Sequence, residues 1–223
     1  MPTQPLPPLP VTSPVAPDTS PIITTPPRGT DLDPIWERVV PETRSRANDI
    51  HLPISLAYAE RLCDCFPEAD ALMVRVALLL HDTGWGRVDE TRIISEGFRG
   101  DWRKADIRFE HERQSCLIAE EVLPDLGYSA DFIAEVNKII DGHDTRPDAL
   151  SLEDALVRDA DRLWRFTTTG IALASGWFDM APSPYTDRLV REIIPELKTQ
   201  PAIEMATAEL ERATAMLKTA VLR

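Results

Sequence analysis

The stretch "VALLLHDTGWG", residues 76–86, decides the fold of this chain. Its first half is an apolar run of the kind that fills one side of a buried helix, and His81 and Asp82 follow directly. An imidazole and a carboxylate are costly to bury unless they form hydrogen bonds or bind a metal. Gly84 and Gly86 come next, and we expect them to let the backbone turn away from a pocket without steric cost.

Composition sets the class of protein. The chain has 223 residues, of which 43% are hydrophobic, enough for one domain with a full core. Its net charge of −13 argues against a broad electrostatic grip on a nucleic-acid polymer or an anionic membrane. No apolar run approaches the roughly 20 residues of a membrane helix, and residues 1–30 lack the basic region and apolar core that are typical of a secretory signal. Three cysteines give no disulfide framework, so we expect ordinary half-buried thiols and a cytoplasmic location.

The periodicity predicts an all-α fold, a single helical-bundle domain over residues 31–223. Residues 1–30 hold ten of the twenty prolines and little helical periodicity, which predicts a disordered tail. Ser129 and Ser151 are typical helix N-caps, and no alternating run indicates a strand. The expected helices cover 33–40, a segment after His51, 67–82, 105–123, 129–143, 151–166, and segments near 185–198 and 202–222.

Four histidines, His51, His81, His111 and His143, lie about 30 residues apart, each in or beside a different predicted helix. Asp161 follows in the segment "RDADRL". One buried histidine is usually just a hydrogen-bonded core residue, but four in succession are a different case. Imidazole and carboxylate ligands suit iron, manganese, zinc or nickel, and a helical bundle is a natural cage for such a centre.

The order His51, then His81-Asp82, then Asp161 resembles the HD-domain superfamily of metal-dependent phosphohydrolases over about residues 40–175. "ALLLHDTGWGR" is similar to the end of that family's central helix, and "DADRL" to its last ligand segment. The resemblance implies that these four residues hold a first metal ion.

His111 and His143 extend the resemblance to the two-metal branch, written H…HD…H…H…D. It implies that Asp82 bridges to a second ion held by these two histidines. That ion has fewer protein ligands and keeps open positions, as a catalytic metal requires. The expected cofactors are therefore two divalent ions per chain, iron, manganese or another transition metal, with Asp82, His111 and His143 as the catalytic group.

The resemblance implies several functions with one ligand set. The first is a phosphohydrolase acting on phosphoric ester or anhydride bonds of a nucleotide or other phosphorylated small molecule. The alternatives are a mixed-valent diiron oxygenase that opens a C–C or C–P bond, and a non-catalytic metal-stabilised scaffold. Trp85 stands where the cyclic-dinucleotide phosphodiesterase and inositol oxygenase branches carry lysine, which argues against both. Self-association into a homo-oligomer is left open.

Arginines near the ligands are candidates for binding a small anionic substrate. Arg158 precedes Asp161 by three residues and shares its helix face, so it either binds a phosphate or phosphonate or pairs with Asp154 at the surface. Arg87 and Arg146 follow two ligand segments and either meet the same anion or are solvated loop charges.

Three further features complete the expectations. Trp102 lies in "EGFRGDWRKAD", residues 96–106, where aromatic and basic residues alternate, as in a lid over a nucleotide or a packed surface loop. Asp159 is expected to support a metal ligand or to be solvated. Asp144 makes a second His-Asp dipeptide, but no apolar helix precedes it, so it is not expected to be a ligand.

Overall fold

The computed structural model describes residues 15–22, 31–96 and 105–219. Within these residues every regular element is a helix and no strand occurs, so the all-α prediction is confirmed. None of the helices there is long and apolar enough to span a bilayer. The segment proposed as a lid falls largely on residues 97–104, so Trp102 lies outside the described part of the chain.

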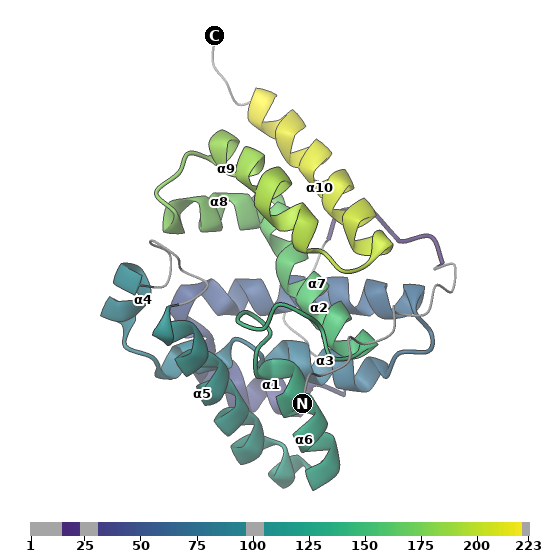
Figure 1. The fold of residues 1–223 in the computed structure, drawn as a ribbon, viewed down its shortest axis with the longest axis vertical. Coiled ribbons are helices and arrows are strands. Elements are labelled where there is room, and N and C mark those ends of the chain that lie inside the picture. Colours follow the sequence, from purple (N-terminus) through teal and green to yellow (C-terminus); the bar gives the residue numbers. More distant parts are fainter. Residues whose placement is uncertain (1–14, 23–30, 97–104, 220–223) are drawn as a thin grey trace, which may run out of the picture.

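The helices follow one another through short connections (Figure 1). They are α1 (Asp33–Val39), α2 (Asn48–Cys65), α3 (Ala71–Leu80), α4 (Glu90–Glu96), α5 (Asp106–Val122), α6 (Ala130–Ile140), α7 (Leu152–Leu163), α8 (Thr168–Trp177), α9 (Pro182–Arg188) and α10 (Gln200–Thr219). Shorter 3₁₀ segments include η1 (Val40–Ala47), η2 (Thr83–Arg87) and η5 (Trp164–Phe166), and a π-helical turn covers Leu189–Ile193.

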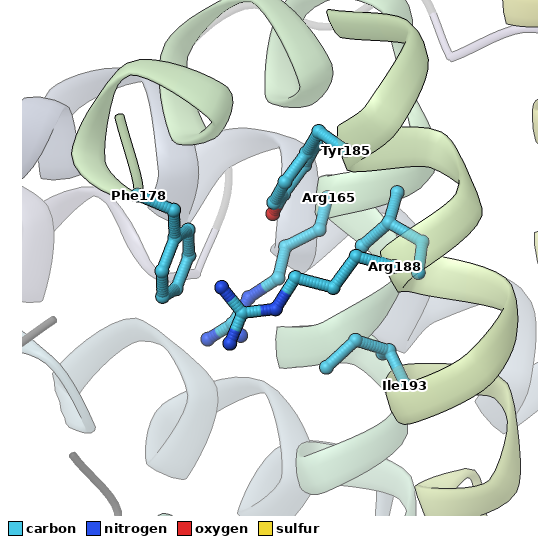
Figure 2. Close-up of a pocket in the computed structure, with 6 residues that line it drawn as sticks. Arg165, Phe178, Tyr185, Arg188 and Ile193 are labelled. Carbon is cyan, nitrogen blue, oxygen red and sulfur yellow. The ribbon is translucent and has the colours of Figure 1, made fainter. Parts of the chain in front are cut away.

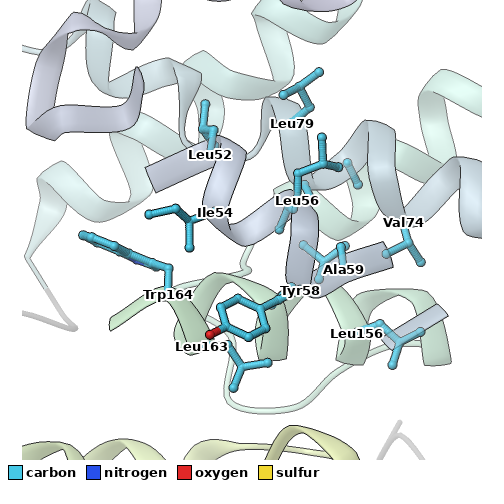
Figure 3. Packing of buried hydrophobic residues seen from close by; sticks show 14 of the residues in the cluster. Leu52, Ile54, Leu56, Tyr58, Ala59, Val74, Leu79, Leu156, Leu163 and Trp164 are labelled. Carbon is cyan, nitrogen blue, oxygen red and sulfur yellow. The ribbon is translucent and has the colours of Figure 1, made fainter. Parts of the chain in front are cut away.

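The core forms where α2, α3 and α7 pack on one another. Figure 3 shows apolar side chains of the three helices and η5 meeting there, namely Leu52, Ile54, Leu56, Tyr58, Ala59, Val74, Leu79, Leu156, Leu163 and Trp164. Burial of such side chains is the main favourable contribution to folding. Because α2, α3 and α7 also carry His51, His81-Asp82 and Asp161, the core holds three of the ligand segments together.

Two N-cap predictions are confirmed. The Ser129 hydroxyl accepts from the backbone N–H of Phe132 at 3.2 Å, and the Ser151 hydroxyl accepts from that of Asp154 at 3.2 Å. Each satisfies one N–H that has no acceptor within the first turn of the helix. These bonds stabilise the first turns of α6 and α7.

Three helix predictions were wrong. Helix α4 was not predicted at all. The helix expected after His51 begins earlier, at Asn48, so His51 lies in its first turn and Pro53 lies inside it. Helix α8 was not predicted, because Gly170 and Gly176 weaken its helical pattern. It forms because the Thr167 hydroxyl accepts from the N–H of Gly170 at 2.9 Å and because its buried side chains pack on the core.

Residues 15–22 of the proline-rich segment lie against the domain. The Arg61 guanidinium donates to the carbonyl oxygens of Asp18 and Ser20, at 3.1 and 2.6 Å, and Ile22 packs against the core. Proline content alone did not predict these contacts.

Candidate metal centre

The six predicted ligands converge from five elements. His51 comes from the first turn of α2, His81 and Asp82 from the end of α3, His111 from α5, His143 from the turn after α6, and Asp161 from α7. None is more than 3% exposed. A cluster of four imidazoles and two carboxylates buried to this degree requires compensation that an apolar core cannot provide.

Four of these residues form one candidate metal-binding group: His51, His81, Asp82 and Asp161. The Oδ1 of Asp161 lies 3.1 Å from the Nε2 of His51 and 3.4 Å from the Nε2 of His81. Ligand atoms about 2.1 Å from one ion stand about 3.0–3.4 Å apart at octahedral to tetrahedral angles. The observed separations therefore fit a single ion.

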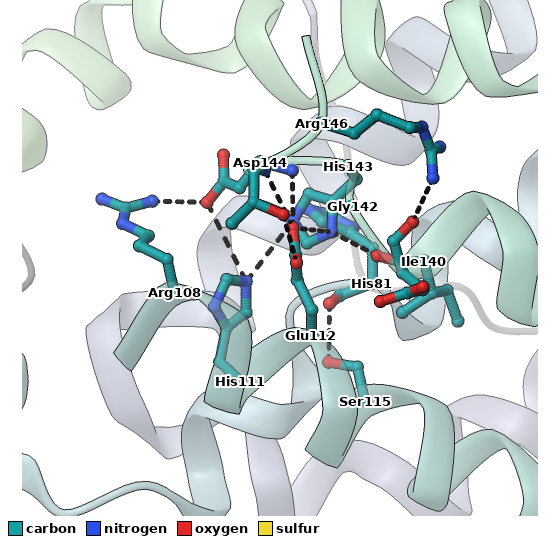
Figure 4. Close-up of polar contacts among 12 residues, drawn as sticks. His81, Arg108, His111, Glu112, Ser115, Ile140, Gly142, His143, Asp144 and Arg146 are labelled. Carbon is teal, nitrogen blue, oxygen red and sulfur yellow. Dashed lines mark hydrogen bonds and ion pairs between the residues drawn. The ribbon is translucent and has the colours of Figure 1, made fainter. Parts of the chain in front are cut away.

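A second group shares Asp82 with the first. Asp82 Oδ1 lies 3.4 Å from the Nε2 of His111 and 3.4 Å from the Nε2 of His143. The two Nε2 atoms are 3.5 Å apart, and Figure 4 shows the two rings directed at each other. Three donor atoms at these separations also fit one ion, and a carboxylate has two oxygens with which to serve both groups.

Backbone carbonyls orient two of the imidazoles. His81 Nδ1 lies 2.6 Å from the carbonyl oxygen of Leu78, and His143 Nδ1 lies 2.8 Å from that of Ile140. Each Nδ1 must therefore donate its proton to the carbonyl, so Nε2, which faces the cluster, is the atom that binds a metal in the neutral ring. His81 Nε2 has no hydrogen-bond partner within the described residues, as expected for a ligand atom without its ion. This donor set fits a divalent transition metal.

The charges of the cluster also suit a cation. Burial by itself raises the pKa of Asp82. The neighbouring histidines, His81 first, lower it by more than that and hold it well below its usual range. Burial lowers the pKa of His51 and His111, which keeps their rings neutral. His143 differs: burial lowers its pKa, but the bond to Asp82 and the nearby carboxylates of Asp144 and Glu112 together outweigh burial and raise the pKa to about 9. Metal binding at His143 therefore releases a proton.

Two tryptophans stack on ligand rings. Trp85 lies over His111 with ring centroids 4.0 Å apart, and its indole N–H donates to Asp82 Oδ1 at 3.0 Å. Trp164 lies over His51 with centroids 4.7 Å apart, and its indole N–H has no hydrogen-bond partner among the described residues. Trp85 thus orients the shared carboxylate. The sequence alone indicated only that Trp85 replaces a lysine found in two other branches of the family, and it did not predict this role.

Two polar residues, Glu112 and Asn48, hold the segments that carry the ligands, and neither was predicted from the sequence. Glu112 accepts from the backbone N–H groups of Asp144 and Thr145, at 2.9 and 3.1 Å, and so fixes the turn that carries His143. Asn48 donates to the backbone oxygen of Asp82 at 2.9 Å. Their positions beside or near a ligand in the sequence were the only available signal.

Buried cations surround the cluster, again without a sequence signal. Arg46 lies 3.7 Å from Asp82 Oδ2 and 4.4 Å from the centre of the Trp85 ring. It adopts φ 56°, a left-handed conformation that costs a non-glycine residue about 1 kcal/mol or more. Arg108 pairs with Asp144, which is buried 3.9 Å from the Nε2 of His111 (Figure 4). Asp144 thus belongs to the surroundings of the cluster without joining either ligand group.

Arg158 does not face a substrate site, which corrects the sequence prediction. It is 1% exposed, and its three nitrogens donate at 2.7 Å to Asp154 Oδ1 and to the carbonyl oxygens of Gly142 and Arg146. The ion pair with Asp154 therefore exists, but it is buried and not at the surface. Arg158 holds the loop after α6 onto α7, and each of its nitrogens is engaged inside the protein and not presented to a bound anion.

Arg87 and Arg146 are also engaged within the protein. Arg87 pairs with Glu42 and Glu121 at 3.1 and 2.7 Å on the surface. Arg146 pairs with Asp154 at 2.6 Å. Neither is brought into the ligand cluster, so the structure supports the alternative in which both are structural charges.

Asp159 neither supports a ligand nor faces solvent. It is fully buried, and its carboxylate accepts from the backbone N–H groups of Lys198 and Thr199 at 2.7 and 2.9 Å. It therefore anchors the start of α10 to α7.

Gly84 and Gly86 are needed for close packing, which corrects the expected reason for them. Neither has a positive φ. A Cβ on Gly84 would stand 2.0 Å from the carbonyl oxygen of His111, and one on Gly86 would stand 2.4 Å from that of Glu42. The missing side chains let η2 press against α5 and η1, which brings Asp82 and His111 together.

Comparison with known proteins agrees with this geometry. The sequence model of the HD domain matches residues 49–165. The chain belongs to the HD-domain family. A crystal structure of a predicted HD superfamily hydrolase from an uncultured Thermotogales bacterium superposes with a TM-score of 0.56 and 22% identity, over 83% of this chain and 88% of that one. At that identity the likeness shows the shared fold. The comparison with curated proteins found no match.

Proposed function

We propose that this HD-domain protein is a metal-dependent hydrolase that cleaves a phosphoric ester or anhydride bond in a small anionic substrate such as a nucleotide. The observation that carries the proposal is the sharing of Asp82 by two ligand groups, one of four residues and one of three. Two such ions would stand close enough to act on a single phosphate. The similar fold of a protein described as an HD superfamily hydrolase supports the reaction class.

The ions, when bound, would supply Lewis-acid charge for an attacking and a leaving oxygen. The smaller group, with His111 and His143, is the side on which substrate would bind, because it offers fewer protein ligands. Asp82 is held for both groups by its bond from the Trp85 indole. The Arg46 guanidinium, 3.7 Å from Asp82 Oδ2, adds positive potential beside the shared carboxylate and favours a negatively charged substrate.

Metal analysis of ligand variants tests the assignment. Asp82→Ala should lower occupancy of both sites, whereas His143→Ala should mainly empty one. Asp131→Ala, an exposed carboxylate in the first turn of α6, is the matched control and should retain the wild-type content. Retention of two ions per chain by Asp82→Ala would show that the shared-ligand assignment is wrong.

Activity assays then separate the reaction classes. Nucleotides, dinucleoside polyphosphates and phosphonates should be tested in air and anaerobically with the metal-loaded protein. Phosphate release that is independent of oxygen supports the hydrolase. Activity confined to air, with two irons per chain, would replace it by an oxygenase, and full metal occupancy without any activity would favour a scaffold.

A further inference from the structure

A small hollow lies beside η5, which follows the ligand-bearing helix α7, and none of the six ligands lines it. Its walls come from η5, α9 and the turns next to them, and its lining residues are Arg165, Phe178, Tyr185, Arg188, Leu189 and Ile193. Figure 2 shows the guanidinium groups of Arg165 and Arg188 in this hollow, with the Phe178 ring at one side. Two cations lining one hollow repel each other, which makes the space between them favourable for an anion.

Arg165 is the more deeply buried of the two. Arg165 is 8% exposed, and its Nε has no hydrogen-bond partner among the described residues. Within that part of the chain no carboxylate lies within ion-pair distance of its guanidinium, although buried cations are normally paired. Burial lowers its pKa, but the nearby carboxylates, Asp161 first, outweigh burial and raise it, so the group stays charged.

Arg188 supplies the second charge from α9. Its guanidinium carbon lies 4.0 Å from the centre of the Phe178 ring, and its Nε donates to Glu192 at 2.9 Å. The stacked ring and the carboxylate fix the plane of the guanidinium. A guanidinium held in one orientation is well suited to bind the oxygens of a phosphate or carboxylate.

The hollow is close to the candidate metal centre. Arg165 follows Asp161 by four residues, about one helical turn, across the junction of α7 and η5. A group bound between the arginines would therefore be near the ions yet separate from them. The space admits only about one water-sized group, so a single oxygen of an anion would enter it while the rest stayed outside.

We propose that Arg165 and Arg188 form an oxyanion-binding subsite, which receives a second anionic group of the substrate while the reacting phosphate lies at the metal centre. The inference rests on the proposed function and narrows its substrate class. The substrate carries at least two anionic groups, as a nucleoside diphosphate or a phosphorylated carboxylic acid does.

Sulfate binding by the full-length, metal-loaded protein tests the subsite. Sulfate should be titrated calorimetrically at constant ionic strength into wild type, Arg188→Gln and Arg191→Gln. Arg191 is exposed in the adjacent turn, so its replacement removes the same charge without touching the hollow. We expect Arg188→Gln to weaken sulfate binding about tenfold, the size of effect expected for losing a hydrogen bond to a charged group. Arg191→Gln should leave the affinity unchanged.

Two results would overturn the proposal: no saturable sulfate binding by the wild type, or equal affinity in Arg188→Gln and Arg191→Gln. Arg165→Met provides a second variant, with circular dichroism to verify its fold; if it does not fold, the Arg188 comparison decides alone. The titration needs no turnover. Sulfate binding that depends on Arg188 in a protein without phosphatase activity would refute the proposed function and keep the subsite, and the reverse pattern would refute only the subsite.

Discussion

Replacing Trp85 by phenylalanine should weaken the metal centre without removing a ligand. The substitution keeps an aromatic face against His111 but removes the indole N–H that donates to Asp82 Oδ1 at 3.0 Å. A hydrogen bond to a charged group contributes about 1.5–3 kcal/mol. The smaller ring also leaves a cavity, which costs about 1 kcal/mol more. We therefore expect a total loss of about 2.5–4 kcal/mol in the free energy of unfolding.

Trp164→Phe is a matched control for this change. Trp164 is also fully buried and also stacks on a ligand ring, that of His51, but its indole N–H donates to no described residue. Its replacement removes the same atoms and creates a similar cavity, so it should cost about 1 kcal/mol. The difference between the two variants, about 1.5–3 kcal/mol, isolates the bond to Asp82.

Urea unfolding followed by circular dichroism measures both losses, first with a chelator and then with Mn²⁺. Chelator competition measures metal affinity, which should fall about 10- to 100-fold in Trp85→Phe, because groups that orient a ligand have effects of this size. The loss in Trp164→Phe should be clearly smaller. If the two variants lose equal stability and equal metal affinity, the indole bond does not orient Asp82 and the reasoning is refuted.

Three other expectations follow from packing and burial. Gly84→Ala should destabilise the protein by at least about 2 kcal/mol, because its Cβ would meet the backbone of α5. A Cβ on Gly176 meets nothing within 4 Å, so Gly176→Ala should change the thermal midpoint little, and equal effects of the two variants would contradict the packing argument. Burial raises the pKa of Cys63 and Cys116 to about 12, so only about one thiol in 10,000 is ionised at pH 8. Alkylation of these thiols by iodoacetamide, followed by mass spectrometry, should therefore be slow until urea is added. Burial, and then a carboxylate partner, raise the pKa of Tyr58 above that of the unfolded chain, so stability should fall as pH rises above about 10, and urea titrations should show a shallower fall for Tyr58→Phe.

The sequence alone determined the class of the fold and the residue types of the metal centre. Helix periodicity and serine caps are local properties, so α6 and α7 could be placed from a few neighbouring residues. The ligands could be found because histidine is rare in this chain and each of the four lies at a helix or helix end. The order of these residues also carried the resemblance to the HD domain, which the family match confirmed.

Only the tertiary structure decided which arginines have their hydrogen bonds satisfied within the protein. Arg158 and Arg165 lie on the same segment, and nothing in the sequence distinguishes them. Arg158 is satisfied by carbonyl groups of the loop after α6, including that of Gly142, whereas Arg165 faces a hollow made with α9. Both environments come from residues distant in the chain. Hydrogen-bond partners of a buried charge are set by whichever segments the core brings beside it, and local sequence does not contain that information.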